Sequence, residues 1–119
     1  MTIGNGVEII GDLAFSGCEA LTDVTIPGNV TTIGRSAFYS CYGLTEATIE
    51  NGVVEIGNGA FSYCKSLRSI TVPDSIISIG ECAFEQCNSL LSATIGNGVK
   101  TIGYLAFSNC HALGNVGDC

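Results

Sequence analysis

Cysteine is the residue type in this sequence with the widest chemical scope. Five of the seven cysteines recur with a 23-residue period, at Cys18, Cys41, Cys64, Cys87 and Cys110. Many zinc sites use cysteines in C-x2-C pairs, and the chain has no pair with that spacing. We therefore expect neither a metal site nor a cofactor, and we interpret the periodic cysteines as buried, inert thiols. Cys82 and Cys119 fall outside this spacing, so we expect them to be more reactive, with Cys82 partly buried.

Other residue types that support catalysis are sparse. His111 is the only histidine, and it occupies a variable position that we expect to be exposed. The serines and threonines have no second histidine or ordered acid that would complete a catalytic triad. The Gly-Asn-Gly turns lack the lysine and the following helix that a phosphate-binding loop uses. The sequence thus predicts no catalytic residue, and we expect no enzymatic activity.

The charge of the chain excludes two classes of partner. The formal net charge is -7, with 4 basic residues against 11 acidic ones. Nucleic acids and anionic membranes both require a clustered basic surface. No stretch approaches the roughly 20 apolar residues that span a bilayer, and the amino terminus lacks the basic and apolar regions of a signal peptide. With 46% hydrophobic residues, however, the chain must fold and bury a core.

The phenylalanines indicate how that core is organised. All five follow one another with a 23-residue period, and alanine, leucine and Ile-Gly positions keep the same period. A fixed period of about 20 to 50 residues is typical of stacked repeats. We therefore predict that residues 1–119 form a single solenoid domain of five 23-residue repeats, with equivalent side chains lying above one another. The phenylalanine row is Phe15, Phe38, Phe61, Phe84 and Phe107.

The third repeat shows the elements expected in each coil. Residues 44–49 alternate apolar and polar side chains, which predicts a half-buried strand. Residues 50–52 form a turn, and Val53 and Ile56 predict a second, extended piece that ends at Gly57. Ala60, Phe61, Cys64 and Leu67 then follow the spacing of one face of a short helical turn. The turns alternate between Asn-Gly versions (Asn5-Gly6, Asn51-Gly52, Asn97-Gly98) and Pro27 or Pro73 versions, which reflects either two turn geometries packed side by side or duplication by pairs.

The repeat also resembles that of a known family. The BspA-like leucine-rich-repeat pattern matches almost the whole chain, in five copies. The resemblance implies a right-handed, curved or slightly twisted solenoid with a parallel β-sheet on one side and short helical turns or extended pieces on the other. It also implies a location at the cell surface or in secretions of gut, oral and parasitic microbes, where members are linked to adhesion to host matrix proteins or other cells. The matching string is Ile26-Pro27-x-x-Val30-Thr31-x-Ile33-Gly34-x-x-Ala37-Phe38-x-x-Cys41-x-x-Leu44-Thr45.

Three groups of outward side chains are candidates for binding. The first is a line of strand threonines, beside which runs a second line that begins with Asp23 and Glu46 and continues as Ser69, Ser92 and Asn115. We expect Arg68 to interrupt the strip that these lines form. These lines form either an ordinary solvent face of β-branched residues or a recognition strip. Exposed tyrosines often anchor contacts, and Tyr39, Tyr42 and Tyr63 lie in adjacent coils, so we predict that they form one contact patch. The threonines are Thr25, Thr48, Thr71 and Thr94.

The ends of the solenoid leave two functions open. The first coil begins at Ile3 and the fifth runs to Val116, without evident caps over the apolar core. Either the chain is a piece of a longer protein, or the ends stack on other copies. We expect a non-enzymatic protein-binding or adhesion scaffold with a protein or glycan ligand. The alternative is a structural self-assembling protein that forms homo-oligomeric dimers or filaments by end-to-end stacking.

Overall fold

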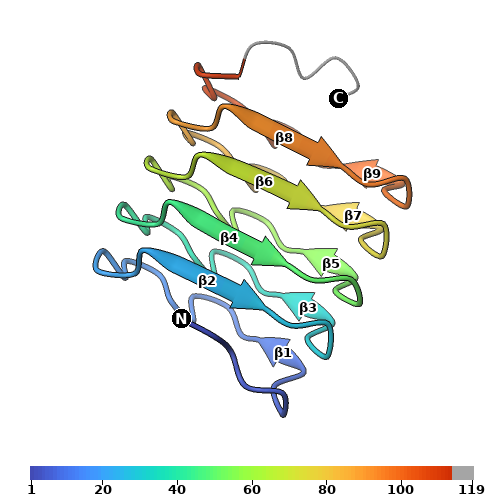
Figure 1. Cartoon of the computed structure of the whole chain (residues 1–119). Coiled ribbons are helices and arrows are strands. Elements are labelled where there is room, and N and C mark those ends of the chain that lie inside the picture. The colour runs from blue at the N-terminus through green and yellow to red at the C-terminus, as the bar shows by residue number, and fades with distance from the viewer. Residues whose placement is uncertain (114–119) are drawn as a thin grey trace.

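The chain folds as a β-solenoid. The computed structural model describes residues 1–113, so Asn115, Cys119 and the carboxyl-terminal end of the predicted domain lie outside the described residues. Two parallel sheets run along the stack (Figure 1). The four-stranded sheet contains β2 (Asp23–Ile26), β4 (Glu46–Ile49), β6 (Ser69–Val72) and β8 (Ser92–Ile95). The five-stranded sheet contains β1 (Ile9–Ile10), β3 (Thr32–Ile33), β5 (Glu55–Ile56), β7 (Ser78–Ile79) and β9 (Thr101–Ile102).

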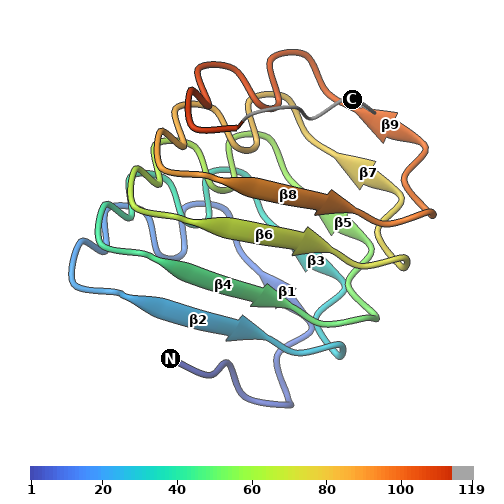
Figure 2. The ribbon, with the colours of Figure 1, turned by 45° about the horizontal axis from the view of Figure 1, so that its top comes forward.

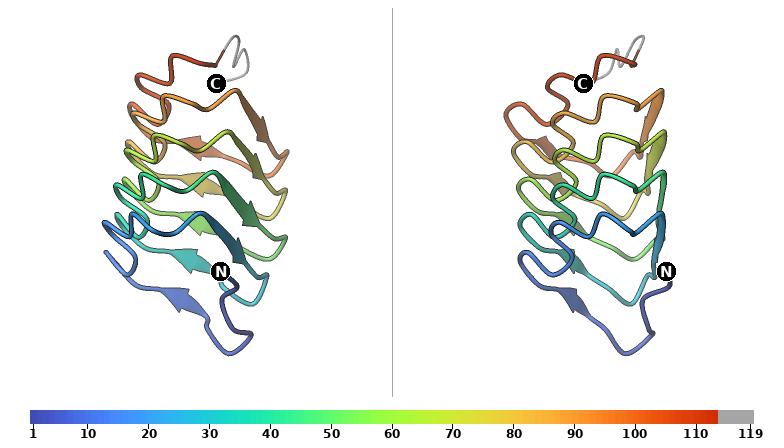
Figure 3. Two further views of the ribbon diagram at one scale, coloured as in Figure 1. Left: turned by 60° about the vertical axis from the view of Figure 1, so that its left-hand side comes forward. Right: turned by 90° about the vertical axis from the view of Figure 1, so that its left-hand side faces the viewer.

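Each strand pairs with its equivalent in the next coil without a shift in register. Thr25 lies opposite Thr48, and Ile33 lies opposite Ile56. In β4 the side chains alternate between exposed and buried, as the sequence pattern predicts. The expected extended pieces also pair with one another, so that they form a second parallel sheet on another side of each coil (Figure 2). The side views show the coils lying one above the other (Figure 3).

The phenylalanines stack into one column through the core. Successive rings have centroids 5.1 to 5.3 Å apart and planes within 9° of parallel. Phe38, Phe61 and Phe84 are fully buried, and the leucine and isoleucine rows surround them. The predicted column of identical side chains is therefore confirmed, and it supplies the buried aromatic surface that no single coil could bury.

The predicted short helical turns are wrong for the described residues, which contain no helix. The segment after Gly34 is a chain of tight turns in which alternate amides bond within the coil and to the next coil. The Ala37 amide donates to the Gly34 carbonyl, whereas the Phe38 amide donates to Ala60. Ser36 (φ 53°) and Ser40 (φ 59°) take left-handed backbone angles, which a right-handed helix excludes. The apolar residues at helical spacing are buried here, but every second amide of the segment bonds to the next coil, so no helix forms.

The Ile-Gly position lets adjacent coils approach closely. A Cβ added at Gly57 would lie 2.8 Å from the Ile33 carbonyl oxygen, in the coil below, and 2.9 Å from the Arg35 backbone nitrogen. The Gly57 amide donates to that same Ile33 carbonyl at 2.8 Å. Gly11 belongs to the first coil, and an added Cβ there would meet nothing within 4 Å. Glycine is therefore required at this position wherever a coil lies beneath it.

The periodic cysteines form a second column, beside the phenylalanines. Cys41, Cys64, Cys87 and Cys110 are buried free thiols, and each donates a hydrogen bond to the phenylalanine carbonyl of the coil below, at 3.0 to 3.2 Å. A hydrogen bond with the neighbouring Cys41 sulfur, together with burial, raises the pKa of Cys64. Hydrogen bonding to Cys110 and burial raise the pKa of Cys87 in the same way.

One member of the row contradicts the expectation that all five thiols are buried. Cys18 is exposed, because it lies in the first coil and no described coil covers it. Cys82 is half-buried, as expected, and burial followed by the nearby Glu85 raises its pKa.

We expect Gly57→Ala to lower the free energy of unfolding by at least about 1–3 kcal/mol, because the added methyl group overlaps backbone atoms that cannot move aside. Chemical denaturation followed by circular dichroism measures this change. The matched control is Gly11→Ala, which we expect to alter stability by no more than about 0.5 kcal/mol. Equal destabilisation by the two substitutions would show that close stacking is not what requires glycine.

We expect thiol alkylation of the folded protein to modify Cys18 first, Cys82 more slowly, and Cys64 and Cys87 slowest. The reason is that only the thiolate reacts, and the raised pKa and burial keep Cys64 and Cys87 neutral and covered. Peptide mapping after timed labelling measures each rate. In denaturant the differences should disappear, and labelling of Cys64 at the rate of Cys18 in the folded protein would contradict the buried column.

Candidate functional site

The strand threonines form a straight polar row on the outer face of the four-stranded sheet. Thr25 pairs with Thr48 and Thr71 pairs with Thr94 in the parallel register. Thr48, Thr71 and Thr94 are exposed, and Thr25 is half-buried. Thr2 adds a further member, because it forms a bridge with Thr25. We call Thr2, Thr25, Thr48, Thr71 and Thr94 the threonine row.

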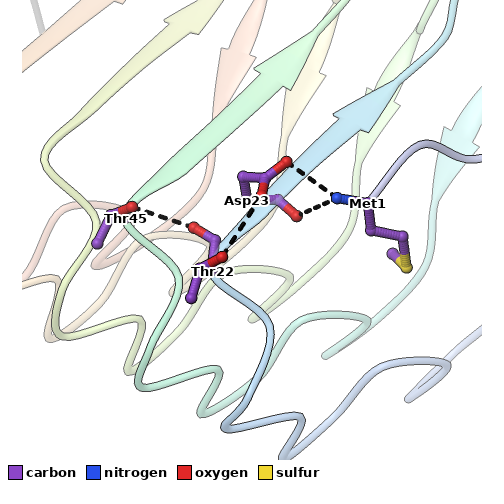
Figure 4. A network of polar contacts seen from close by, with 4 residues as sticks. All are labelled: Met1, Thr22, Asp23 and Thr45. Atoms are coloured by element: carbon purple, nitrogen blue, oxygen red, sulfur yellow. Dashed lines mark hydrogen bonds and ion pairs between the residues drawn. The ribbon is translucent and has the colours of Figure 1, made fainter.

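A second row, two residues earlier in each strand, carries the carboxylates. Asp23 pairs with Glu46, and Glu46 pairs with Ser69. The Met1 amino group donates to the Asp23 carbonyl oxygen and to its Oδ2, both at 2.9 Å (Figure 4). That hydrogen bond and the positive charge of the amino group lower the pKa of Asp23. The carboxylate stays ionised in this arrangement, so this end of the row is a hydrogen-bond acceptor that is already occupied.

Arg68 lies at the margin of this face. Its amide donates to the Thr45 carbonyl at 3.1 Å, as the Thr45 amide donates to the Thr22 carbonyl. The Thr45 hydroxyl also donates to the Thr22 carbonyl oxygen (Figure 4). Arg68, Thr45, Glu46 and Ser69 line a shallow hollow. The residue above Arg68 is Leu91, which is 66% exposed. The face therefore mixes hydroxyl groups, carboxylates, one guanidinium group and one exposed apolar side chain.

Two of the three candidate tyrosines, Tyr39 and Tyr63, pack against one another on the turn side of the coils, and Lys65 links Tyr63 to Tyr42. The rings of Tyr39 and Tyr63 have centroids 5.6 Å apart at an angle of 57°. Lys65 places its Nζ 5.5 Å from the Tyr42 ring and 5.9 Å from the Tyr63 ring. Tyr39 and Tyr42 remain 38% and 42% exposed. We call Tyr39, Tyr42, Tyr63 and Lys65 the tyrosine cluster.

Sequence reasoning missed three residues of these surfaces. Thr2 stands one 23-residue period before Thr25, so its spacing was a sufficient signal. Lys65 stands one period after Tyr42, in the same variable row, which makes a contact between neighbouring coils predictable in hindsight. Leu91 breaks a row that is otherwise polar, with Thr22, Thr45 and Arg68 before it. The structure thus resolves the candidates into two patches, the threonine row with its flanking residues and the tyrosine cluster.

Neither patch carries the usual apparatus of catalysis or metal binding. His111 is exposed, as expected. Within residues 1–113, no group of three or more histidines, cysteines, aspartates and glutamates is arranged to hold a metal ion. A further open hollow lies along the five-stranded sheet, at the glycines that directly follow its strands, because glycine has no side chain to fill the space. The described residues contain no helix that is long and apolar enough to cross a membrane.

Comparison with solved structures finds similar bacterial solenoids. A T. pallidum leucine-rich repeat protein is 34% identical, with a TM-score of 0.91 over 95% of this chain and 55% of that protein. A leucine-rich repeat protein from Eubacterium ventriosum is 33% identical, with a TM-score of 0.89 over 97% of this chain and 31% of that protein. A leucine-rich cell surface protein from Faecalibacterium prausnitzii is 28% identical, with a TM-score of 0.58 over 92% of this chain and 42% of that protein. The chain therefore spans only about half, or less, of each relative.

The repeat itself matches a family model. The model, described as "BspA type Leucine rich repeat region (6 copies)", matches residues 1–114. It counts six copies where the 23-residue spacing counts five coils. Among functionally curated proteins, none matches the sequence. Because the family model covers nearly the whole chain and two solved relatives exceed 30% identity across it, this chain belongs to the BspA-type leucine-rich repeat family.

Proposed function

We propose that this chain is a non-enzymatic binding scaffold of the adhesion type, exposed at a cell surface or secreted. The tyrosine cluster carries the proposal. Its rings are partly exposed and already packed against one another and against Lys65, so little conformational entropy is lost when a partner covers them. Tyrosines with such preorganisation are frequent anchors of protein interfaces. The description of the F. prausnitzii relative as a cell surface protein supports the proposed location.

The threonine row is the second contact surface in this proposal. Its hydroxyls stand about 4.8 Å apart along the sheet, at the spacing of paired strands. Each hydroxyl can donate and accept a hydrogen bond, and the flanking Glu46 and Arg68 add charge of both signs. A protein ligand fits the tyrosine cluster best, because aromatic side chains provide large buried area. A glycan fits the threonine row equally well. Binding experiments with both classes of ligand therefore have to distinguish a protein partner from a glycan partner.

The chain itself offers substitutions that preserve the fold. Ser16, Ser62 and Ser108 occupy the row of Tyr39, Asn88 occupies the row of Tyr42, and Asn109 occupies the row of Tyr63. The combined variant Tyr39→Ser, Tyr42→Asn, Tyr63→Asn should therefore keep the coil geometry. We expect it to raise the Kd for a protein ligand by at least about tenfold. Biolayer interferometry against a panel of extracellular matrix proteins and glycans measures this change.

Two controls separate the surfaces. Tyr104 is 75% exposed and lies outside the cluster, so Tyr104→Asn, which copies Asn58 of the same row, should leave the Kd unchanged. Thr48→Val with Thr71→Val should weaken a glycan ligand more than a protein ligand. Failure of every member of the panel to bind, or equal losses in the cluster variant and in Tyr104→Asn, would refute the proposal.

A second candidate function is end-to-end assembly, favoured by the face of the first coil. Ile9 and Leu13 are 64% and 62% exposed there, and Phe15 is only partly buried. In this chain no described coil covers that face, and the space beside Gly11 is open. A second copy could place its last coil there and continue both sheets, as adjacent coils do within the chain.

Light scattering across a dilution series tests this candidate. If copies stack, we expect large particles of variable length that dissociate on dilution. Gly11→Ala should abolish them, because the added methyl group would meet the backbone of the incoming coil, as a Cβ at Gly34 would meet Gly11 and Asp12. A monomer at every concentration, or assembly that Gly11→Ala leaves intact, would rule it out.

A further inference from the structure

Four Asn-Gly steps give this chain a chemistry that its binding role does not use. They are Asn5-Gly6, Asn51-Gly52, Asn58-Gly59 and Asn97-Gly98. In such a step the glycine nitrogen can attack the asparagine side chain, because glycine has no Cβ to hinder the approach. Attack requires a glycine N–H that can lose its proton and an asparagine side chain that can rotate toward the glycine nitrogen. The structure gives the four steps different surroundings.

The reaction begins when the glycine amide loses its proton to solvent and its nitrogen bonds to the asparagine Cγ. The bond between Cγ and Nδ2 breaks, and ammonia leaves with a proton from solvent. The resulting five-membered succinimide is opened by water at either carbonyl, which gives aspartate or isoaspartate. The net change is one water consumed and one ammonia released per asparagine, with no oxidant or reductant involved.

At Asn58, both the side chain and the following glycine amide form hydrogen bonds with Glu81. Its Oδ1 accepts a hydrogen bond from the Glu81 amide at 2.8 Å. The Gly59 amide donates to the Glu81 carbonyl, also at 2.8 Å. Coil four therefore restrains the Asn58 side chain and occupies the Gly59 amide, which is the nucleophile of this step. Attack would require the two coils to separate locally.

Asn51 is held on the nucleophile side. The Gly52 amide donates to Ser75 Oγ at 2.9 Å, and that hydroxyl in turn donates to the Val53 carbonyl at 2.7 Å. A hydroxyl can do both because it is donor and acceptor at once. Ser75 is the residue directly after Gly52 in the same row, 23 positions along the chain. One side chain of coil four thus protects the turn of coil three.

Asn5 has a different residue above it. The equivalent of Ser75 is Asn29, whose Nδ2 donates to the Val7 carbonyl at 2.6 Å. Asn29 therefore reproduces the donor half of the serine contact, whereas its Oδ1 accepts no hydrogen bond from the Gly6 amide. Asn5 and Gly6 are exposed, and the Gly6 amide has no hydrogen-bond partner within residues 1–113.

Asn97 lies in the turn between β8 and β9. Its own backbone amide donates to Asp74 Oδ1 at 2.8 Å, which fixes the turn on the coil below. The side chain of Asn97 is exposed. The amide of Gly98 has no hydrogen-bond partner among the described residues. The backbone of Asn97 is fixed, but the reacting groups, which are the Asn97 side chain and the Gly98 amide, make no hydrogen bond among the described residues.

We propose that Asn5 and Asn97 are sites of spontaneous deamidation, and that stacking of the next coil protects Asn51 and Asn58. Conversion of Asn97 places a new carboxylate close to Asp74, which already accepts the Asn97 amide. The isoaspartate product also inserts one extra atom into the backbone of a coil whose length must match its neighbour. The modified protein is therefore more acidic and less well stacked at that coil.

Incubation of the folded protein in mildly alkaline buffer at physiological temperature tests the proposal. Peptide mapping by mass spectrometry follows the four asparagines in one sample. We expect Asn5 and Asn97 to convert at least about tenfold faster than Asn58, and Asn51 to convert more slowly than either. In denaturant, the four steps should convert at similar rates, because each has the same Asn-Gly sequence. Ion-exchange chromatography should show the matching acidic forms, and Asn97→Asp should elute with them.

Ser75→Ala supplies the decisive comparison. It removes the acceptor of the Gly52 amide, so conversion of Asn51 should accelerate while Asn58, in the same molecule, stays slow. Asn58 thereby reports whether the coils still stack. Conversion of Asn58 or Asn51 as fast as Asn97 in the folded wild-type protein would overturn the proposal. So would an unchanged rate at Asn51 in the variant, or rates at Asn5 and Asn97 far below those in denaturant.

Discussion

The separation between adjacent coils is the constraint on which the rest of this structure depends. Each coil must lie on the one below at about the spacing of paired strands, 4.8 Å, around its whole circumference. On the sheet sides, amides of one coil donate to the coil before it, as Gly57 does to Ile33. On the turn side the direction reverses, and Phe38 donates to Ala60 of the coil after it. The glycine row follows from this constraint, because a Cβ there would enter the backbone below.

The same constraint explains why so much of the fold was predictable. A row of identical side chains with a 23-residue period can stack only if each coil has the same path, so the phenylalanine column and the register of the strands follow from spacing alone. The turn segment was mispredicted because spacing reports burial and not hydrogen bonding. Ala60, Phe61, Cys64 and Leu67 are all buried, as a helix would require. Their neighbours Gly59 and Tyr63 take left-handed angles, which the apolar pattern does not encode.

The candidate site was less predictable, for a related reason. Rows fix which positions face outward, so the alignment of the threonines and the contact between Tyr39 and Tyr63 follow from spacing, whereas their role in binding stays a prediction. Contacts within the surface depend on how long side chains bend between coils, and the position of Lys65 over two rings is of that kind. The exposure of Cys18 was not predicted, because the 23-residue spacing is the same for every member of the cysteine row and does not report which member lacks a neighbouring coil. A member at the end of a stack has a neighbour on one side only.

A solenoid of this kind can vary only at its outward positions, so the binding role proposed here depends on the differences between coils. Those differences are not spread evenly. Coils two and three contribute all members of the tyrosine cluster, and the equivalent rows of the other coils carry no tyrosine. Arg68 directly precedes β6 in the next coil. The threonine row, in contrast, is unchanged from Thr2 to Thr94 and offers a partner no means of choosing a register along it. A ligand bound to that row alone could slide by one coil, and the tyrosine cluster is the feature that would fix its position.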